Sequence, residues 1–426
     1  MGRSCRSGPM IRSLAVNFAR TLKRFCLLLS LVSVTSVLTA CGTTFVYKDP
    51  GVIPQSLFGM TVLNFENVNA PIKYGTTRTW DSFPMLDWAD INSAPGVYNF
   101  LQLDAFLKIN QERNVDVIYT FGRTPLWASS QPNTPGPYGP GQCAPPTDLK
   151  NWDNYVTAIA VHAGTRIAYW ELWNEPQDPK YYCGDMRTLL TMAQHAYRII
   201  KSVNPAAQVI TPSAAAEGGP AWLDTYLSQG GGNYADIMSF HGYCNSEAES
   251  INSVVSQYRN VISAHGQGTK PLWDTEADWA GDPDDVLYGS ANRAAFIAKY
   301  YLLQWSGGVS RFVWYAYDGG TWGGFSSTAT DGDPDVTAYN TVQQWMEGAS
   351  MPSACIQDPG NTWTCSLTRA GGYQALVLWN PSTTLSYKAS KQYSDVRDLS
   401  GSVYPLSGGR VPVGESPVLI ETSKVF

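Results

Sequence analysis

Apolar residues follow two different spacings along residues 57–350, and the two spacings alternate. Short runs rich in β-branched and aromatic residues predict eight strands, at 57–64, 76–80, 115–121, 166–174, 207–213, 235–243, 270–276 and 310–317. Apolar residues spaced three and four apart predict amphipathic helices at 100–113, 151–163, 186–203, 247–265, 291–306 and 336–347. Strands separated by helices imply right-handed crossovers and a parallel sheet, and eight such units predict a closed (β/α)8 barrel.

An open, doubly wound sheet is the alternative for an alternating pattern of this kind. The number of units disfavours it, and so does the lack of a Gly-rich phosphate-binding turn after the first strand. After residue 350 the pattern changes to short strand-like runs separated by Gly, Pro and Ser, which predicts a small domain over 351–426. The predicted fold class is therefore α/β, a TIM barrel over 57–350 followed by a small all-β, sandwich-like domain.

The pattern of the N-terminal segment predicts a targeting signal. Arg20, Lys23 and Arg24 precede the apolar run "FCLLLSLVSVTSVLTA", whose length fits a signal peptide better than a membrane-spanning helix. The "LTAC" that ends at Cys41 resembles the lipobox of bacterial lipoproteins, which implies that residues 1–41 end at a lipidated Cys41. An ordinary secretory signal with a chance cysteine is the alternative. Both readings predict export, either to the bacterial cell envelope on a lipid anchor or into the medium, with 42–56 as a lead-in linker.

Export predicts that the remaining cysteines form disulfides, because disulfides persist in oxidising compartments. Cys355 and Cys365 bracket a turn-like segment, so we expect them to pair. Cys143 and Cys183 both lie in long loops and are expected to form a second disulfide, which leaves Cys244 free. No CxxC or Cys/His spacing indicates a metal site, so we expect neither a metal nor another cofactor.

Composition narrows the classes of function. The net charge is −6 and the part after the signal has no cluster of Lys and Arg, which argues against nucleic-acid binding. The 15 Trp and 24 Tyr supply flat faces that suit sugar rings as well as protein cores. Four of these lie in loops after predicted strands and are candidates for stacking on sugars: Trp80, Trp127, Trp279 and Trp322.

Two acids lie at the carboxyl ends of predicted strands. Glu175 ends the fourth strand, in "YWELWNEPQ", and Glu276 ends the seventh, in "PLWDTEADW". The loops that follow barrel strands enclose one cavity, and strands four and seven lie nearly opposite each other across it, so both acids should face a sugar-sized gap. Glycoside hydrolysis requires two such carboxyl groups in different protonation states. Glu171 and Asp274, deeper in the barrel, are expected to belong to a hydrogen-bonded structural network.

Five features in this order resemble the clan of retaining (β/α)8 glycoside hydrolases. They are Arg78 at the second strand, Asn174-Glu175-Pro176 at the fourth, His241-x-Tyr243 at the sixth, Glu276 at the seventh and Trp314 at the eighth. The Asn-Glu pair alone is a weak signal, whereas the ordered set is specific and spans residues 55–426. The β-domain after the barrel makes family 39 the most similar family, with family 5 as its rival.

The resemblance implies a role for each matching residue. Glu175 would be the general acid/base and Glu276 the nucleophile, with Asn174 bonded to the sugar 2-hydroxyl. Arg78 and Tyr243 are expected to hold Glu276 ionised, and His241 to support the acid/base or the substrate. Trp314 is expected to lie under the sugar in the reacting subsite. Trp127 and Trp279 are expected to bind further sugar units.

The predicted function is a retaining hydrolase of an extracellular or envelope polysaccharide, acting as a monomer that contacts the membrane only through its lipid. A non-catalytic carbohydrate-binding lipoprotein is the alternative from a different class of function. A metal-dependent barrel hydrolase is disfavoured because the sequence lacks the His clusters that such sites need.

Overall fold

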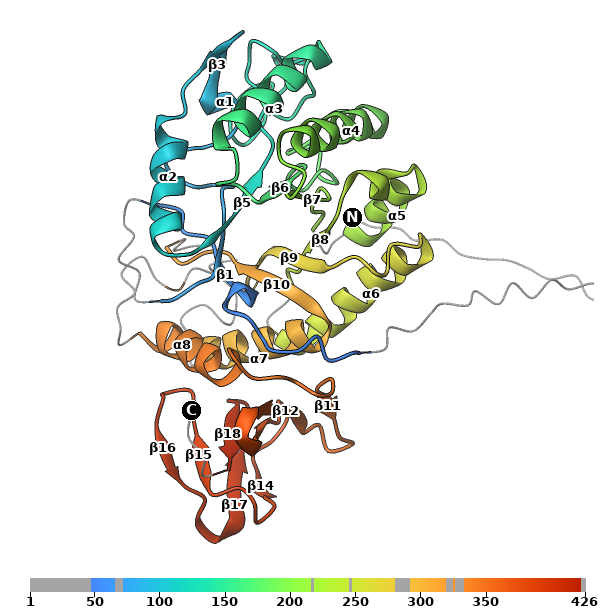
Figure 1. Cartoon of the computed structure of the whole chain (residues 1–426). Coiled ribbons are helices and arrows are strands. Elements are labelled where there is room, and N and C mark those ends of the chain that lie inside the picture. The colour runs from blue at the N-terminus through green and yellow to red at the C-terminus, as the bar shows by residue number, and fades with distance from the viewer. Residues whose placement is uncertain are drawn as a thin grey trace, which may run out of the picture. The chain divides into compact units, whose positions relative to one another are not determined.

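The computed structural model describes residues 47–65, 72–215, 218–244, 247–279, 292–318, 325 and 333–422. Eight parallel strands form the centre of the larger domain (Figure 1). They are β1 (Phe58–Met60), β2 (Thr76–Arg78), β5 (Asp116–Thr120), β6 (Tyr169–Glu171), β7 (Gln208–Ile210), β8 (Met238–His241), β9 (Leu272–Ala277) and β10 (Val309–Trp314). Each lies within or overlaps one of the eight predicted strands, so the predicted barrel is confirmed.

The sheet closes on itself. Its order is β7-β6-β5-β2-β1-β10-β9-β8, and every hydrogen-bonded pair is parallel. The two end strands meet through the segment before β8: the Ile237 amide donates to the Val209 carbonyl at 3.1 Å, and the Thr211 amide donates to the Ile237 carbonyl at 3.0 Å. This ring excludes the open, doubly wound alternative.

Helices cover the outside of the barrel (Figure 1). They are α2 (Leu101–Glu112), α3 (Leu149–Ala163), α4 (Met186–Val203), α5 (Gly219–Ser228), α6 (Ile251–Ala264), α7 (Arg293–Ser306) and α8 (Pro334–Met346). The α4 helix shows the reason for their placement: its buried residues, from Leu189 to Ile200, recur at three- and four-residue spacing, and the Asp185 carboxylate caps the Thr188 amide at 2.9 Å. The sequence reading missed α5, which begins in a Gly-Gly-Pro segment.

Short elements fill the connections. The chain between β2 and α2 contains α1 (Trp88–Ile91) and the hairpin of β3 (Asn92–Ala94) and β4 (Val97–Tyr98). Single 3₁₀ turns occur at η1 (Gln55–Leu57), η2 (Gly231–Tyr234), η3 (Ala248–Ser250), η4 (Ala370–Gly372) and η5 (Ser407–Gly409). Apolar side chains fill the barrel interior beneath the strand ends, so it is a packed core and not a pore: Ile118, Ile210, Ile237, Trp273 and Val313.

The C-terminal domain consists of antiparallel strands, as predicted. One sheet has the order β11 (Ile356–Gln357), β12 (Trp363–Arg369), β13 (Tyr373–Trp379), β18 (Val418–Glu421), β15 (Asp395–Arg397) and β16 (Val403–Pro405). A second pairs β14 (Leu385–Lys388) with β17 (Arg410–Val413). Buried side chains from both sheets, including Leu378, Val411 and Ile420, form one apolar cluster, which gives the domain its sandwich-like core.

The described part of the lead-in segment, residues 47–56, is bound to the rest of the fold. Ile53 is fully buried and its amide donates to the Ala349 carbonyl at 2.7 Å, while the Tyr47 hydroxyl donates to the Met351 carbonyl at 2.6 Å. From residue 47 onward the lead-in is therefore not a free spacer. Cys41 and the predicted signal lie outside the described residues. No helix within the described ranges is both long and apolar enough to cross a membrane.

Both predicted disulfides are confirmed. Cys143 pairs with Cys183 and Cys355 pairs with Cys365, with Cα–Cα separations of 5.2 and 4.3 Å, and Cys244 is a buried free thiol. The first disulfide joins the loop after β5 to the loop after β6 and spans 40 residues of sequence. It therefore links two of the loops that enclose the cavity described next.

Candidate active site

The chain turns sharply at Glu175, one of the two predicted acids. Its backbone has a φ of +40°, which is unusual for a residue with a Cβ, and its amide donates to the Ser213 carbonyl at 2.8 Å. Pro176 follows and provides no amide hydrogen to continue the strand. A positive φ at a non-glycine residue is held only where surrounding contacts determine it, and such residues cluster at functional sites.

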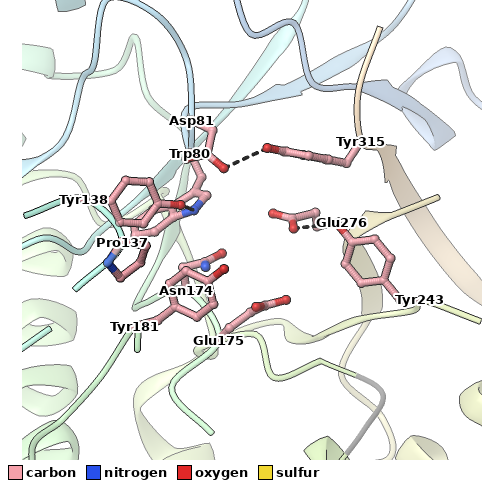
Figure 2. Close-up of a pocket in the computed structure, with 10 residues that line it drawn as sticks. All are labelled: Trp80, Asp81, Pro137, Tyr138, Asn174, Glu175, Tyr181, Tyr243, Glu276 and Tyr315. Atoms are coloured by element: carbon pink, nitrogen blue, oxygen red, sulfur yellow. Dashed lines mark hydrogen bonds between the residues drawn. The ribbon is translucent and has the colours of Figure 1, made fainter. Parts of the chain in front are cut away.

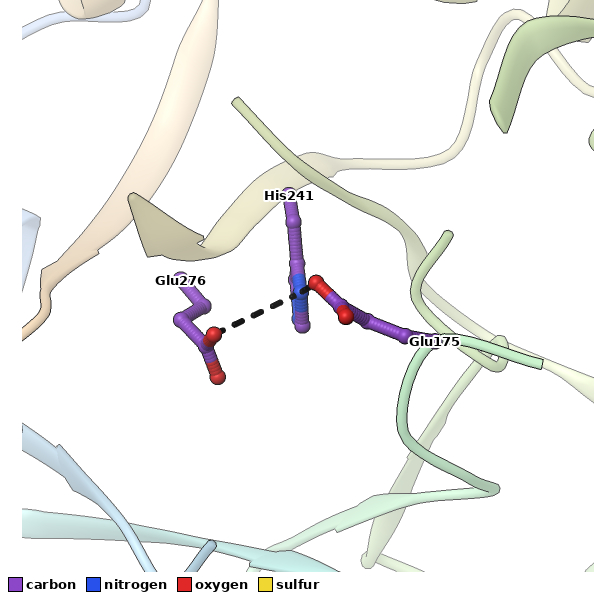
Figure 3. A group of neighbouring side chains, drawn as sticks. All are labelled: Glu175, His241 and Glu276. Carbon is purple, nitrogen blue, oxygen red and sulfur yellow. Dashed lines mark hydrogen bonds and ion pairs between the residues drawn. The ribbon is translucent and has the colours of Figure 1, made fainter. Parts of the chain in front are cut away.

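Glu175, His241 and Glu276 meet at the carboxyl ends of the barrel strands (Figure 3). One oxygen of each acid and a ring nitrogen of His241 all lie within 4.8 Å of one another. His241 Nδ1 is 2.8 Å from Glu175 Oε1 and 3.9 Å from Glu276 Oε1. Burial alone would lower the pKa of His241, but the Glu276 and Glu175 carboxylates reverse this and hold its pKa above the usual value. A positive charge on the imidazole is therefore stabilised between the two acids.

Arg78 binds three acceptors beneath the acids. From the end of β2 its guanidinium donates to Glu171 Oε2 at 2.7 Å, to Glu276 Oε2 at 2.5 Å and to Asn174 Oδ1 at 2.7 Å. Burial alone would lower the pKa of Arg78, but Glu171 and Glu276 raise it above its already high value, so this side chain is a fixed cation. Because a guanidinium can only donate, it orients the Asn174 amide and leaves the Asn174 NH2 group for other partners.

Each oxygen of Glu276 accepts a hydrogen bond from a different donor. The Tyr243 hydroxyl donates to Oε1 at 2.7 Å, and Arg78 donates to Oε2. Burial raises the pKa of Glu276, and the nearby Glu175 raises it further, whereas His241 and Arg78 oppose the rise. The Glu276 carboxylate thus accepts hydrogen bonds from a cation and a phenol. Charge repulsion between Glu276 and Glu175 makes it unfavourable for both to be ionised at once.

The deeper acids belong to a hydrogen-bonded network, as expected. Glu171 is fully buried and accepts hydrogen bonds from Arg78, from Thr120 at 2.7 Å and from Ser213 at 2.5 Å. Burial raises the pKa of Glu171, but Arg78 and the other donors outweigh this and lower it. In contrast, burial raises the pKa of Asp274 to about 8.

A cavity of about 620 Å³ opens above these acids (Figure 2). This volume is within the range typical of small-molecule sites. Its walls come from loops that follow several barrel strands, all at the same end of the barrel. The lining residues are Trp80, Asp81, Pro137, Tyr138, Asn174, Glu175, Tyr181, Tyr243, Glu276 and Tyr315.

Three of the predicted sugar-binding Trp residues do not line this cavity. Trp314 is fully buried and packs against Phe312, Tyr301 and Trp279, and Trp279 is almost fully buried in the same cluster. Strand alternation explains the difference, because Val313 points into the barrel core, Trp314 points outward to the helices, and Tyr315 points inward again. The wall position expected for Trp314 is therefore occupied by Tyr315.

The third of these, Trp127, packs beside the hairpin of the β2–α2 connection. Its indole N–H donates to the Asn92 carbonyl at 2.8 Å, and its ring packs against the core around α3. Trp80 is the only one of the four aromatic loop candidates found in the cavity wall, and Trp322 lies outside the described residues. Five lining residues were not among the candidates predicted from the sequence: Asp81, Pro137, Tyr138, Tyr181 and Tyr315.

The trio of Glu175, His241 and Glu276 also has the side-chain types that could hold a metal ion. However, Arg78 already supplies a fixed positive charge at 2.5 Å from Glu276, and an added cation would meet that charge. The donor set contains a single imidazole. The arrangement therefore fits two carboxyl groups held beside a fixed cation better than it fits a metal centre.

A (β/α)8 barrel with an opposed acid pair in a cavity at its carboxyl-terminal face is typical of O-glycosyl hydrolases. Comparison with known families agrees: the model of "Glycosyl hydrolases family 39" matches residues 69–301. The chain belongs to glycosyl hydrolase family 39, and the family 5 alternative is not needed.

Solved structures with the same fold align with both domains of this chain. A family 39 glycoside hydrolase from Bacteroides cellulosilyticus WH2 has a TM-score of 0.68 at 19% identity, covering 87% of this chain and 81% of that one. A family 39 β-xylosidase from Caulobacter crescentus has a TM-score of 0.67 at 18% identity, covering 89% and 98%. A glucosidase from Croceicoccus marinus has a TM-score of 0.61 at 16% identity, covering 89% and 98%. Identities this low establish the fold alone.

Proposed function

We propose that this family 39 enzyme hydrolyses glycosidic bonds with retention of configuration, with Glu276 as nucleophile and Glu175 as acid/base. The observation that carries the proposal is the approach of the two carboxyl groups, whose nearest oxygens lie within 4.8 Å in one cavity. Retaining enzymes hold their carboxyl groups about 5 Å apart, whereas inverting enzymes separate them by roughly 6.5–9.5 Å to admit a water molecule.

In the first step a Glu276 oxygen bonds to the anomeric carbon while the bond to the leaving oxygen breaks. Glu175 donates its proton to that leaving oxygen. Arg78 and Tyr243 hold the Glu276 carboxylate ionised and oriented before the attack. The hydrogen bond between Glu175 and His241 keeps the acid aimed across the cavity and places a transferable proton between the two side chains.

In the second step Glu175 takes a proton from water, the water oxygen bonds to the anomeric carbon, and Glu276 leaves as a carboxylate. Esterified Glu276 carries no charge, so it no longer repels the carboxylate that takes the proton from water. The free amide NH2 of Asn174 would donate to the sugar 2-hydroxyl, a contact that strengthens as positive charge develops on the ring.

We propose further that the enzyme acts outside the cytoplasm on a polysaccharide, as a monomer attached to the cell envelope through a lipid on Cys41. The N-terminal charged and apolar pattern supports export. The two disulfides support an oxidising compartment.

Azide rescue tests the two assigned roles separately. With dinitrophenyl glycosides, Glu276→Ala should lose turnover, and azide should restore it by forming a glycosyl azide of inverted configuration. For Glu175→Ala, azide should give a glycosyl azide of retained configuration, because it attacks the glycosyl-enzyme. The control is Glu112→Ala at the exposed end of α2, which should behave like the wild type. Wild-type-like turnover of either active-site variant without azide would refute the assignment.

A further inference from the structure

Asp81 is a third carboxyl group in the cavity, and the two-acid mechanism does not use it. It lies in the loop after β2 and has a φ of +61°. The Tyr315 hydroxyl donates to Asp81 Oδ2 at 2.9 Å, which fixes the carboxylate against the opposite wall. Figure 2 shows both side chains at the far side of the cavity from Glu175. A strained backbone and a dedicated hydrogen-bond donor thus hold a charged group at one end of the cavity.

The described part of the cavity wall has no Lys or Arg side chain to balance Asp81. Its described lining includes three carboxyl groups and neither Lys nor Arg. Arg78, beneath the wall, is already paired with both Glu171 and Glu276. Arg123 and the exposed Lys180 line a small neighbouring hollow behind Trp80 and Tyr138, and Arg123 is bound to Asp87 at 2.5 Å.

The internal segments outside the described ranges carry no basic residue in the sequence either. Residues 66–71, 216–217, 245–246, 280–291, 319–324 and 326–332 contain no Lys, Arg or His in the sequence, and each of them contains a polar or acidic residue. Arg78 is paired with Glu171 and Glu276, and His241 lies between Glu175 and Glu276, whereas no Lys, Arg or His within the described ranges forms an ion pair with Asp81. An anion bound beside Asp81 would therefore meet repulsion that no ion pair of Asp81 offsets.

We propose that Asp81 binds hydroxyl groups of the reacting sugar, and that the site selects a neutral sugar and rejects a uronic acid. This inference rests on the proposed function. Glu175 marks the side where the leaving oxygen departs, so Asp81, on the far side, faces the hydroxyls most distant from the anomeric carbon. An ionised carboxylate accepts hydrogen bonds from two hydroxyls, whereas it repels the carboxylate of a uronic acid.

Matched neutral and acidic substrates test this preference in the wild-type enzyme. The probes are both anomers of 4-nitrophenyl glucoside, xyloside and galactoside, compared with the glucuronide and galacturonide. We expect kcat/KM for at least one neutral sugar to exceed that for its uronate counterpart by about 100-fold or more. Asp81→Asn should lower kcat/KM for the neutral sugar by about 10- to 100-fold. The ratio of kcat/KM for the neutral sugar to kcat/KM for the uronate should fall by at least about tenfold.

Asn is the chosen replacement because it tolerates a positive φ as Asp does, and thermal unfolding will report whether the variant folds. Asp224→Asn, on the exposed face of α5, makes the same change in net charge away from the cavity and should leave both values unchanged. Tyr315→Phe, which frees the Asp81 carboxylate, should raise KM if Asp81 binds substrate.

Three results overturn the inference: wild-type preference for a uronate, Asp81→Asn kinetics within twofold of the wild type, or an unchanged KM in Tyr315→Phe. Failure of the wild type to hydrolyse any glycoside contradicts the proposed function instead.

Discussion

Replacing Tyr243 by Phe removes one hydrogen bond to Glu276 and leaves the ring that packs beside it. The hydroxyl lies 2.7 Å from Glu276 Oε1, and in the variant Arg78 still donates to Oε2. A hydrogen bond to a charged group contributes about 1.5–3 kcal/mol. Since 1.36 kcal/mol corresponds to about one pKa unit, losing this donor should raise the pKa of Glu276 by about 1–2 units.

The assay is the dependence of kcat/KM on pH. Glu276 must be ionised to attack, so activity falls as pH drops through its pKa, and Tyr243→Phe should move this acidic limb upward by about 1–2 pH units. At pH values below the limb, kcat/KM should fall by roughly 10- to 100-fold. Tyr258→Phe is the matched control, because it removes a buried hydroxyl that donates to the Ala214 carbonyl and not to an acid. An acidic limb that stays in place in Tyr243→Phe would refute the reasoning.

Two further predictions concern stability. Replacing Cys143 and Cys183 by Ser removes a link across 40 residues, so the free energy of unfolding should fall by about 3–4 kcal/mol in urea titrations; an unchanged midpoint would contradict this. Asp274, with its pKa raised to about 8, favours the folded state while protonated, and this contribution is lost as pH rises from about 4 to 8. The free energy of unfolding of the wild type should fall by about 1.4 kcal/mol per pH unit more steeply than that of Asp274→Asn over this range. Parallel pH dependences of the two proteins would contradict the prediction.

The barrel and the acid pair could be predicted because the spacing of apolar residues in the sequence is enough to locate the strands and the end of the barrel where both acids lie. Strand periodicity located all eight barrel strands, and parallel strands bring Glu175 and Glu276 to the same end of the barrel without knowledge of the loops. The pairing of Cys143 with Cys183 was expected because both lie in long loops, and the structure shows that these loops follow the neighbouring strands β5 and β6.

The cavity wall could not be predicted in the same way. Trp314 and Tyr315 are adjacent, and which of them faces the cavity depends on the register of β10 against the core, where Val313 points inward. Asp81 lies just beyond β2, and only the left-handed turn of its backbone directs it into the cavity. Helix α5 was missed because Gly and Pro residues precede its apolar pattern.

Covalent labelling tests the central claim most directly. The wild-type enzyme is incubated with an activated 2-fluoro glycoside of a sugar that it hydrolyses, digested, and mapped by mass spectrometry. If Glu276 is the nucleophile of a retaining mechanism, one sugar should be attached to the peptide that contains Glu276, and Glu175 should remain unlabelled. Attachment to another residue, or release of a product with inverted configuration, would contradict the account.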